Sequence, residues 1–466
     1  MTAFKFADLH CHPNLKTFGH TFKKKAHRKQ NIWYTQKPNA LSKLLEHYSG
    51  ICKFTQTDLS SISKAGGKIS FVSLYPFEKG FFLNAVGKGK TMALMAGWAT
   101  GIGYERVRHL QQHTNYFEDL ANEYQFFISS QRSKVIEGQR YTWVPTSNWQ
   151  EVERALNTPN EIAVVFTIEG AHVFNTGLSE YGREIDEEQV LQNIHTLKSW
   201  QFPPVFITLA HNFNNDFCGH ARSLEPIERY VDQGKNLGKG ILPLGEKVLA
   251  ALLDEQAGRR IYIDLKHMSL NARKAYYDFL KVHYPKDTIP LIVSHGALTG
   301  VKYNGEASIP SNTALFYQSD INFFDEEIVN IGQSGGLFAI QFDSRRLTSK
   351  MARNSFDKFS KTLSIPSTQI IWNHIRHVAE LLDLNGLFAW GTACIGSDYD
   401  GTIKPLRGML TVEAFPTMAR DLLFLANEYL KGPNRLTIPE NKRISPEELV
   451  ERFCFTNAIY FLNKHF

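Results

Sequence analysis

The chain alternates short apolar runs with longer helix-like stretches. Short runs rich in β-branched and aromatic residues, bounded by turn residues, are typical of buried strands. Eight such runs are predicted as strands: 3–7, 68–75, 162–168, 205–210, 259–265, 289–294, 335–342 and 393–397. Helices are predicted between several of them, at 187–200, 244–256 and 271–283. This alternation favours a parallel sheet in an α/β fold, and about eight strands favour a (β/α)₈ TIM barrel over an open doubly wound sheet.

Other segments interrupt this repeating pattern. Residues 14–55 are polar and aromatic without steady periodicity and are interpreted as an insertion. Asp58 is a plausible N-cap of a short helix that Gly66 closes, and residues 80–140 are predicted to be mostly helical. Ser445 and the following proline predict a closing helix over 445–466. We therefore expect residues 1–466 to form a single barrel domain, with insertions at about 14–55 and 80–160.

Composition narrows the class of protein. A chain of 466 residues with 43% hydrophobic residues can bury a substantial core. The net charge of +6 is small for this length, and the basic cluster at 23–29 is interpreted as a solvated loop, so no nucleic-acid partner is expected. Five scattered cysteines without a C-x-x-C pair favour a reducing compartment. With no signal peptide and no membrane-spanning run, we expect a soluble cytoplasmic protein without a membrane partner.

Side chains that can bind metals follow several of the predicted strands. His10 and His12 come just after the first, and side chains at i and i+2 of an extended chain project together, so both imidazoles can chelate one ion while Cys11 points away. Other polar residues stand at later strand ends: Glu169, His211, His267, His295 and Asp398. The carboxyl ends of barrel strands form the rim where active sites lie. A single histidine at a strand end has an ordinary structural explanation, but six such ends in one chain favour a site.

These residues suffice for two metal ions. His10, His12 and Glu169 supply three ligands for one ion, and Glu169, His267 and His295 supply three for a second if the carboxylate bridges. Three protein ligands plus a water are typical of catalytic zinc. Two neighbouring ions can polarise a carbonyl group and generate a bound hydroxide near neutral pH. Two divalent cations, foremost Zn²⁺, are therefore predicted, although manganese, cobalt or iron also suit these ligands.

The ordered set of motifs resembles the membrane (renal) dipeptidase family, peptidase family M19, within the amidohydrolase superfamily. Each motif is short and unspecific, but the set occurs in family order along the whole chain. The matching stretches are Asp8-Leu9-His10-Cys11-His12-Pro13, Gln56-Thr57-Asp58-Leu59 with Gly66-Gly67, Glu169-Gly170-Ala171-His172, Thr208-Leu209-Ala210-His211-Asn212, Ile263-Asp264-Leu265-Lys266-His267-Met268-Ser269, Ser294-His295 and Ile395-Gly396-Ser397-Asp398-Tyr399-Asp400-Gly401.

The resemblance implies a di-zinc barrel hydrolase that cleaves the amide bond of dipeptide-like substrates by attack of a metal-bridging hydroxide, often as a homodimer. It implies metal-ligand roles for His10, His12, Glu169, His267 and His295, with Glu169 bridging. His211 is expected to contact the substrate, and Asp398 to act as general acid and base. Asp264 and Lys266 are assigned to supporting roles rather than to the metals.

Three departures from the family pattern bear on the substrate. Family members usually carry an aspartate where His12 stands. An arginine that grips the substrate carboxylate is expected after the sixth strand, and Ile321 stands there, which cannot make that contact. Arg345 and Arg346 are candidates to replace it from another direction. The insertions at 14–55 and 80–160 exceed the family norm and are expected to reshape the mouth of the pocket.

Three functional hypotheses follow. The first is a metal-dependent dipeptidase. The second keeps the barrel and the metals but changes the substrate to another small amide, such as a cyclic amide, or to a lactone or phosphoester, which the missing arginine and the insertions favour. The third is a catalytically inactive metal-binding scaffold, against which the filled ligand positions and Asp398 argue. Nucleic-acid binding is a remote fourth hypothesis, and a steep salt dependence would be its signature.

Overall fold

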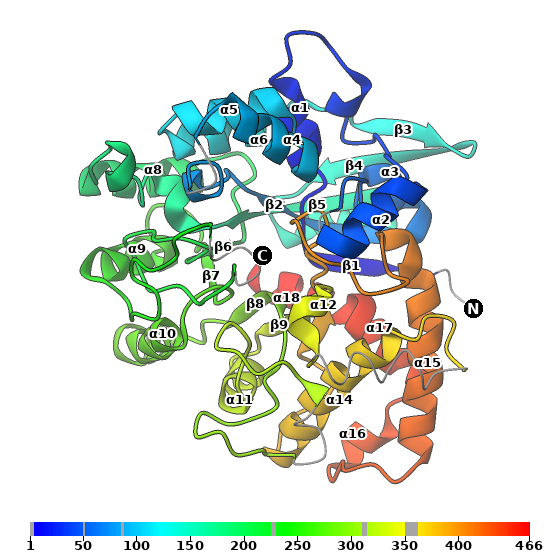
Figure 1. Cartoon of the computed structure of the whole chain (residues 1–466). Coiled ribbons are helices and arrows are strands. Elements are labelled where there is room, and N and C mark those ends of the chain that lie inside the picture. Colours follow the sequence, from blue (N-terminus) through cyan, green and yellow to red (C-terminus); the bar gives the residue numbers. More distant parts are fainter. Residues whose placement is uncertain (1–3, 50–51, 85–87, 225–229, 310–314, 350–361) are drawn as a thin grey trace.

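The computed structural model describes residues 4–49, 52–84, 88–224, 230–309, 315–349 and 362–466. Its centre is a nearly closed barrel of parallel strands in the order β1-β2-β5-β6-β7-β8-β9-β10, with helices around it (Figure 1). The strands are β1 Phe6–Cys11, β2 Gly67–Leu74, β5 Glu161–Glu169, β6 Phe206–Thr208, β7 Tyr262–Asp264, β8 Ile292–Gly296, β9 Leu337–Ile340 and β10 Ala393–Ile395. The predicted (β/α)₈ barrel is thereby confirmed.

The barrel closes between its first and last strands. The amide of His12 donates to the carbonyl of Tyr399, and the amide of Asp398 donates to the carbonyl of His10, both at 2.9 Å. These bonds lie beyond the end of β10, among the residues predicted to be functional. Closure of the barrel therefore brings β1 and the segment that follows β10 together at the predicted site.

Helices pack around the strands and fill the segments between them. They are α1 Leu15–Thr21, α2 Ala40–Ser49, α3 Leu59–Ala65, α4 Lys90–Thr100, α5 Tyr104–Gln112, α6 Tyr116–Ser129, α7 Trp149–Asn157, α8 Glu187–Lys198, α9 Pro243–Leu253, α10 Leu270–His283, α11 Asp325–Gln333, α12 Ser344–Leu347, α14 Thr368–Leu384, α15 Phe415–Lys431, α16 Pro439–Arg443, α17 Pro446–Glu451 and α18 Asn457–His465. Figure 1 places α8 to α11 and α14 to α15 around the strands in chain order.

The first strand differs from its prediction. Residue 3 lies outside the described residues, and β1 begins at Phe6 and continues through the histidine motif to Cys11. It extends so far because it pairs in parallel with β2 up to Cys11, which is opposite Val72. Histidine and cysteine carry little strand preference of their own, so the pairing partner sets the end of this strand.

The prediction of a mostly helical region at 80–140 is partly wrong. Helices α4, α5 and α6 occupy its centre, and residues 85–87 lie outside the described part of the chain. A hairpin of β3 Ser133–Ile136 and β4 Gln139–Pro145 follows, and β4 joins the edge of β5 in parallel. The hairpin turns at Glu137 and Gly138, both with positive φ. Two positive φ angles suit a tight hairpin turn, but a Glu-Gly pair is a weaker sequence signal than Asn-Gly.

The predicted helix ends are confirmed at two places. The Asp58 side chain accepts a hydrogen bond from the amide of Ser61, and Gly66 ends α3 with a φ of 87°. Near the C-terminus the Ser445 side chain accepts from the amide of Glu448 at the start of α17. The closing helix predicted over 445–466 contains a π-helical segment, Arg452–Thr456, between α17 and α18.

The barrel is filled by apolar side chains from opposite strands. One buried cluster joins residues of seven barrel strands, among them Leu9, Phe71, Val165 and Phe206, with Phe461 of α18. Side chains that meet from strands across a barrel make its interior a packed core rather than a channel. The chemistry must therefore take place at the rim and not through the barrel.

All five cysteines are buried and none forms a disulfide, as the sequence predicted. Among the described residues, no helix has both the length and the apolar character needed to cross a bilayer.

Candidate metal centre

The seven residues predicted to be functional lie together at the carboxyl ends of the barrel strands. His10, Glu169 and His295 belong to β1, β5 and β8. The other four follow the ends of β1, β6, β7 and β10 within a few residues: His12, His211, His267 and Asp398. Because parallel strands all present their carboxyl ends at one rim, residues separated by up to 388 positions in the sequence converge.

Glu169 stands at the centre of this group. Its Oε1 lies 3.5 Å from Nε2 of His10, 3.3 Å from Nε2 of His267 and 3.5 Å from Nε2 of His295. Its Oε2 lies 3.2 Å from Nε2 of His12. The Nε2 atoms of His10 and His12 are 3.1 Å apart, and those of His267 and His295 are 3.2 Å apart. The carboxylate thus contacts the imidazoles of both pairs, as a bridging ligand would.

The protonation of His12 tests whether a cation fits. Its Nδ1 lies 3.0 Å from the carbonyl oxygen of Ser73, which can only accept, so Nδ1 carries the proton. In the neutral ring Nε2 then presents a lone pair toward His10 and Glu169. The buried Nδ1 atoms of His10 and His267 find no hydrogen-bond partner among the described residues. Lone pairs and a carboxylate that converge in a buried space favour an electropositive centre between them, and imidazole with carboxylate is a donor set that zinc prefers.

Asp398 also comes within reach of the imidazoles. Its Oδ1 lies 3.9 Å from Nε2 of His10 and 3.8 Å from Nε2 of His12, and its Oδ2 lies 4.0 Å from Nε2 of His295. His10, His12 and Asp398 form one group of donors that can hold an ion, as do His10, Glu169 and His295. The carboxylate of Asp398 therefore faces both pairs of imidazoles.

The backbone is held in unusual conformations at this rim. Gly170, directly after Glu169, has a φ of 91°, and a Cβ atom there would lie 2.3 Å from Nδ1 of His172. His267 and Asp398 have φ angles of 65° and 59°. Such left-handed conformations cost about 1–3 kcal/mol for residues other than glycine and concentrate at functional sites.

Two buried aspartates fasten the strands that carry the histidines. Asp8 accepts hydrogen bonds from the amides of His10 and Ser397, at 3.3 and 2.8 Å, and so joins β1 to the segment after β10. Asp264 accepts from Thr208 at 2.9 Å and from the amide of Ser294 at 3.0 Å. The supporting role expected for Asp264 agrees with these bonds, which hold neighbouring strands in register.

Glu78 is a residue of the site that the sequence did not reveal. Both of its carboxylate oxygens lie 2.9 Å from Nδ1 of His211, whose Nε2 lies 3.4 Å from Oε1 of Glu169. Tyr75 donates its hydroxyl proton to Glu78 at 2.5 Å. The signal for Glu78 in the sequence is an acidic residue four positions after the end of β2.

The charges in the site differ from one group to the next. Burial alone would raise the pKa of Glu169, but the His211 and His10 imidazoles hold that pKa well below its usual value. Burial, and then the charge of Glu169, raise the pKa of Asp398 well above its usual value. Burial, followed by the charge of His211, lowers the pKa of His267 to about 3. The site thus combines a charged carboxylate, a carboxyl group that favours its protonated form, and imidazoles whose pKa values are shifted down at His267 and up at His12 and His211.

A cavity of about 340 Å³ opens above Glu169, His267, His295 and Asp398. One wall is apolar and comes from the end of β2 and from α4: Tyr75, Phe77, Phe81, Phe82, Met92, Ala96 and Ala99. The second predicted insertion therefore shapes the pocket through α4. Among the described residues of 14–55 none lines the cavity, so the expectation that this first insertion reshapes its mouth is not met.

Ile321, which stands where the family resemblance places an arginine, is buried and lines the same cavity. The cationic side chains of the wall are Lys266, Arg345 and Arg346. Ile321 therefore faces the cavity but leaves recognition of an anion to other residues.

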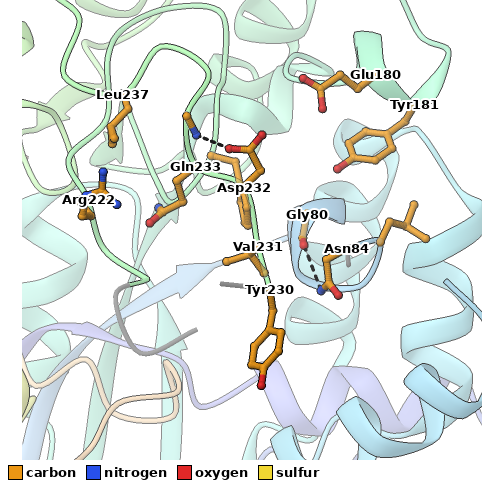
Figure 2. Close-up of a pocket in the computed structure, with 13 residues that line it drawn as sticks. Gly80, Asn84, Glu180, Tyr181, Arg222, Tyr230, Val231, Asp232, Gln233 and Leu237 are labelled. Carbon is orange, nitrogen blue, oxygen red and sulfur yellow. Dashed lines mark hydrogen bonds between the residues drawn. The ribbon is translucent and has the colours of Figure 1, made fainter. Parts of the chain in front are cut away.

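A second pocket, of about 500 Å³, lies on the other side of the segment that follows β2 (Figure 2). Gly80 and Leu83 line this second pocket, whereas Phe81 and Phe82 line the cavity of the metal centre. Its polar groups include Glu180, Asp232 and Gln233. It contains none of the clustered histidines, so the chemistry belongs to the first cavity.

Comparison with known proteins agrees with this architecture at the level of fold. No family model and no curated protein matches the sequence. The barrel fold is similar to that of solved metallopeptidase structures, one of which belongs to family M19.

Three solved structures are similar to this chain over nearly their whole length. Dipeptidase AC, a metallopeptidase of family M19, is 15% identical, with a TM-score of 0.52 over 92% of this chain and 96% of that one. A metallopeptidase from Rhodobacter sphaeroides, bound to a phosphinate mimic of the dipeptide L-Ala-D-Ala, is 14% identical, with a TM-score of 0.55 over 99% of both chains. The probable dipeptidase PvdM from Pseudomonas aeruginosa is 12% identical, with a TM-score of 0.51 over 98% of this chain and 94% of that one.

Proposed function

We propose that this protein is a binuclear metal-dependent hydrolase that cleaves the amide bond of dipeptide-like substrates. The observation that carries the proposal is the convergence of four imidazole Nε2 atoms on the carboxylate of Glu169, at 3.2–3.5 Å. His10 and His12 would hold one divalent cation and His267 and His295 the other, with Glu169 between them. Zinc is the ion we propose first, because it prefers imidazole and carboxylate ligands.

When bound, such ions polarise a carbonyl group and lower the pKa of water toward neutrality. The protein's own groups supply the rest. Asp398 faces the imidazoles from the cavity side, and its pKa is raised by burial and then by the charge of Glu169. A carboxyl group with a raised pKa can hold a proton and give it to a leaving amine. We assign Asp398 this role of general acid and base.

His211 is assigned to the substrate. Burial disfavours its charged form, but Glu78 and then Glu169 raise its pKa above the usual value. A protonated imidazole can stabilise negative charge that develops on the substrate oxygen during attack. Glu78 would hold His211 in position through the contact with Nδ1, because that contact leaves Nε2 directed toward the centre.

The apolar wall of the cavity supports a substrate with a hydrophobic side chain. Tyr75, Phe77 and Phe81 exclude water from one side of Glu169, and exclusion of water strengthens the electrostatic interactions within the site. The volume of about 340 Å³ lies in the range of cavities that hold small molecules. A dipeptide-sized compound therefore suits the space.

The test is a metal analysis combined with an activity panel. Purified protein loaded with zinc is expected to contain two ions per chain by elemental analysis and to hydrolyse members of a dipeptide panel. Asp398→Asn should lower kcat at least about 100-fold because the proton donor is lost, while the metal content stays at two. Wild-type protein that binds two ions but hydrolyses no dipeptide would contradict the substrate assignment.

Ile321 and the aromatic wall also favour a second candidate, the hydrolysis of another small amide, such as a cyclic amide, or of a lactone or phosphoester, at the same centre. These substrates need the same metal chemistry but no free carboxylate. Lactones and phosphotriesters assayed beside the dipeptides separate the two candidates by their kcat/KM values. If the protein carries its full metal content but hydrolyses none of these substrates, the remaining hypothesis is a catalytically inactive metal-binding scaffold.

A further inference from the structure

Lys266 presents a buried ammonium group to the cavity without a partner in the protein. The residue follows β7, lines the cavity and is 2% exposed. Across the described ranges of the chain, its Nζ atom makes no hydrogen bond and no ion pair, although its backbone amide donates to Asp264 at 3.1 Å. Among the described residues no carboxylate forms a close ion pair with this ammonium group, so its burial beside a metal centre requires an explanation.

Lys266 and His267 are consecutive residues beyond the end of β7, and both line the cavity. In a regular strand consecutive side chains point to opposite faces, so Lys266 and His267 would not both line one cavity. His267 has a φ of 65°, which breaks this alternation. The strained residue therefore places an ammonium and an imidazole side by side on the cavity wall.

The other cations of the wall are engaged in the protein. The Arg345 guanidinium binds both carboxylate oxygens of Asp343, with contacts of 2.6–3.0 Å, so its charge is compensated. Arg346 donates to the carbonyl oxygen of Ser223. Lys266 and Arg346 thus place two cationic side chains on one wall of the cavity, where an anionic group of a substrate would meet complementary charge.

The position of Lys266 relative to the metal centre suits recognition of the C-terminal end of a dipeptide. Only one residue separates the scissile carbonyl of a dipeptide from its terminal carboxylate, a spacing of about 3.8 Å between successive Cα atoms. Lys266 directly precedes His267, whose Nε2 lies 3.3 Å from Glu169. We propose that Lys266 recognises the free carboxylate of the substrate, in place of an arginine at position 321. This inference rests on the proposed function and makes that function specific for substrates with an anionic end.

The experiment compares acid and amide forms of one compound. A dipeptide and its C-terminal amide serve as substrates, and a phosphinate dipeptide mimic with either end serves as a ligand for calorimetry on the zinc-loaded protein. Because the phosphinate is common to both ligands, its own interaction with the metals cancels in the ratio of the two Kd values. Wild type is expected to prefer the acid form by at least about tenfold in Kd and in kcat/KM.

Lys266→Met should abolish this preference by weakening binding and turnover of the acid form, with zinc content unchanged, and Lys266→Arg should restore part of it. Lys281→Met, which removes an exposed lysine of α10, is the matched control and should keep the preference. An unchanged preference in Lys266→Met would overturn the inference. Equal Kd and kcat/KM values of wild type for the acid and the amide would also overturn it, without the need for a variant. In both cases continued hydrolysis leaves the proposed function intact. Wild-type protein that neither hydrolyses the dipeptide nor binds either mimic would overturn both.

Discussion

A Cβ atom on Gly401 would lie 2.0 Å from Oδ1 of Asp398, so the carboxylate occupies space that only glycine leaves open. Gly401→Ala must therefore displace the group proposed to carry the proton. We expect kcat to fall by about 100-fold, comparable to the loss of a general acid, with both metal ions retained.

Gly240→Ala is the control for this substitution, because the nearest atom to a Cβ at that position is 4.0 Å away. Steady-state kinetics and elemental analysis of both variants check the prediction. Full activity in Gly401→Ala would show that Asp398 tolerates displacement and is not the proton donor.

Removal of the charge on Glu78 tests the position of His211. In Glu78→Gln the amide oxygen can still accept from Nδ1 of His211, but the negative charge that raises the pKa of the imidazole is gone. We expect a loss of about 10- to 100-fold in kcat, the usual effect of removing a group that orients a site residue. The limb of the kcat–pH profile that comes from deprotonation of His211 should also move to lower pH, because the pKa of His211 falls.

Glu180→Gln is the matched control, since Glu180 lines the second pocket and is largely exposed (Figure 2). Its kcat and pH profile should equal those of wild type. An identical profile for Glu78→Gln and Glu180→Gln would contradict the proposed role of the Glu78–His211 pair.

Metal removal should lower thermal stability, because the four imidazoles around Glu169 bind the ions only in the folded chain. A ligand present at 100 times its Kd stabilises the folded state by about 2.7 kcal/mol. Dialysis against a chelator is therefore expected to lower Tm by several degrees, and added zinc should restore it. Scanning calorimetry measures both steps.

Two variants assign this stabilisation to the proposed centre. Glu169→Gln, which lacks the bridging charge, should show little rise in Tm with zinc, whereas Asp398→Asn should keep most of the rise. A full rise in Glu169→Gln would mean that zinc binds elsewhere.

Glu123 of α6 predicts a pH dependence of stability outside the metal centre. It is buried and accepts hydrogen bonds from Asn14 at 2.5 Å and from the amide of Tyr75 at 2.8 Å. Burial raises its pKa from 4.5 to about 8. Between these values the folded state binds more protons than the unfolded state, so this group's contribution to stability falls as pH rises from about 4.5 to about 8.

Glu123→Gln removes this contribution. The difference in Tm between wild type and Glu123→Gln should shift in favour of the variant as pH is raised from 5 to 9, and then level off. A difference that is constant with pH would show that Glu123 is charged throughout in the folded protein.

The class of fold was accessible from local patterns along the chain. Apolar runs between helices are set by burial on both faces of a parallel sheet, and that requirement is visible without knowledge of the partner strands. The eight predicted strands all occur, with ends that differ by a few residues. The β3–β4 hairpin was missed because its strands are short and its Glu137-Gly138 turn lacks the usual sequence signal.

The candidate site was accessible for a related reason. Metal-binding side chains at strand ends share one rim in any parallel barrel, so His10, Glu169 and His295 could be grouped before their distances were known. Their types and positions in the sequence sufficed, because topology alone brings strand ends together. The roles proposed for Glu78 and Lys266 could not be inferred in this way, because they depend on the residues that surround each side chain in the folded protein.

Burial, partners and direction are properties of the folded chain. Lys266, Arg345 and Arg346 line the same cavity as Ile321 in the folded protein. The sequence does not reveal that Arg345 pairs with Asp343, whereas the Lys266 ammonium group forms no close ion pair among the described residues. That difference depends on the tertiary surroundings of each side chain, which no local pattern in the sequence predicts. The periodicity of a strand is thus visible in neighbouring residues of the sequence. The environment of a charged side chain depends on residues that are distant in the sequence and that only folding brings together.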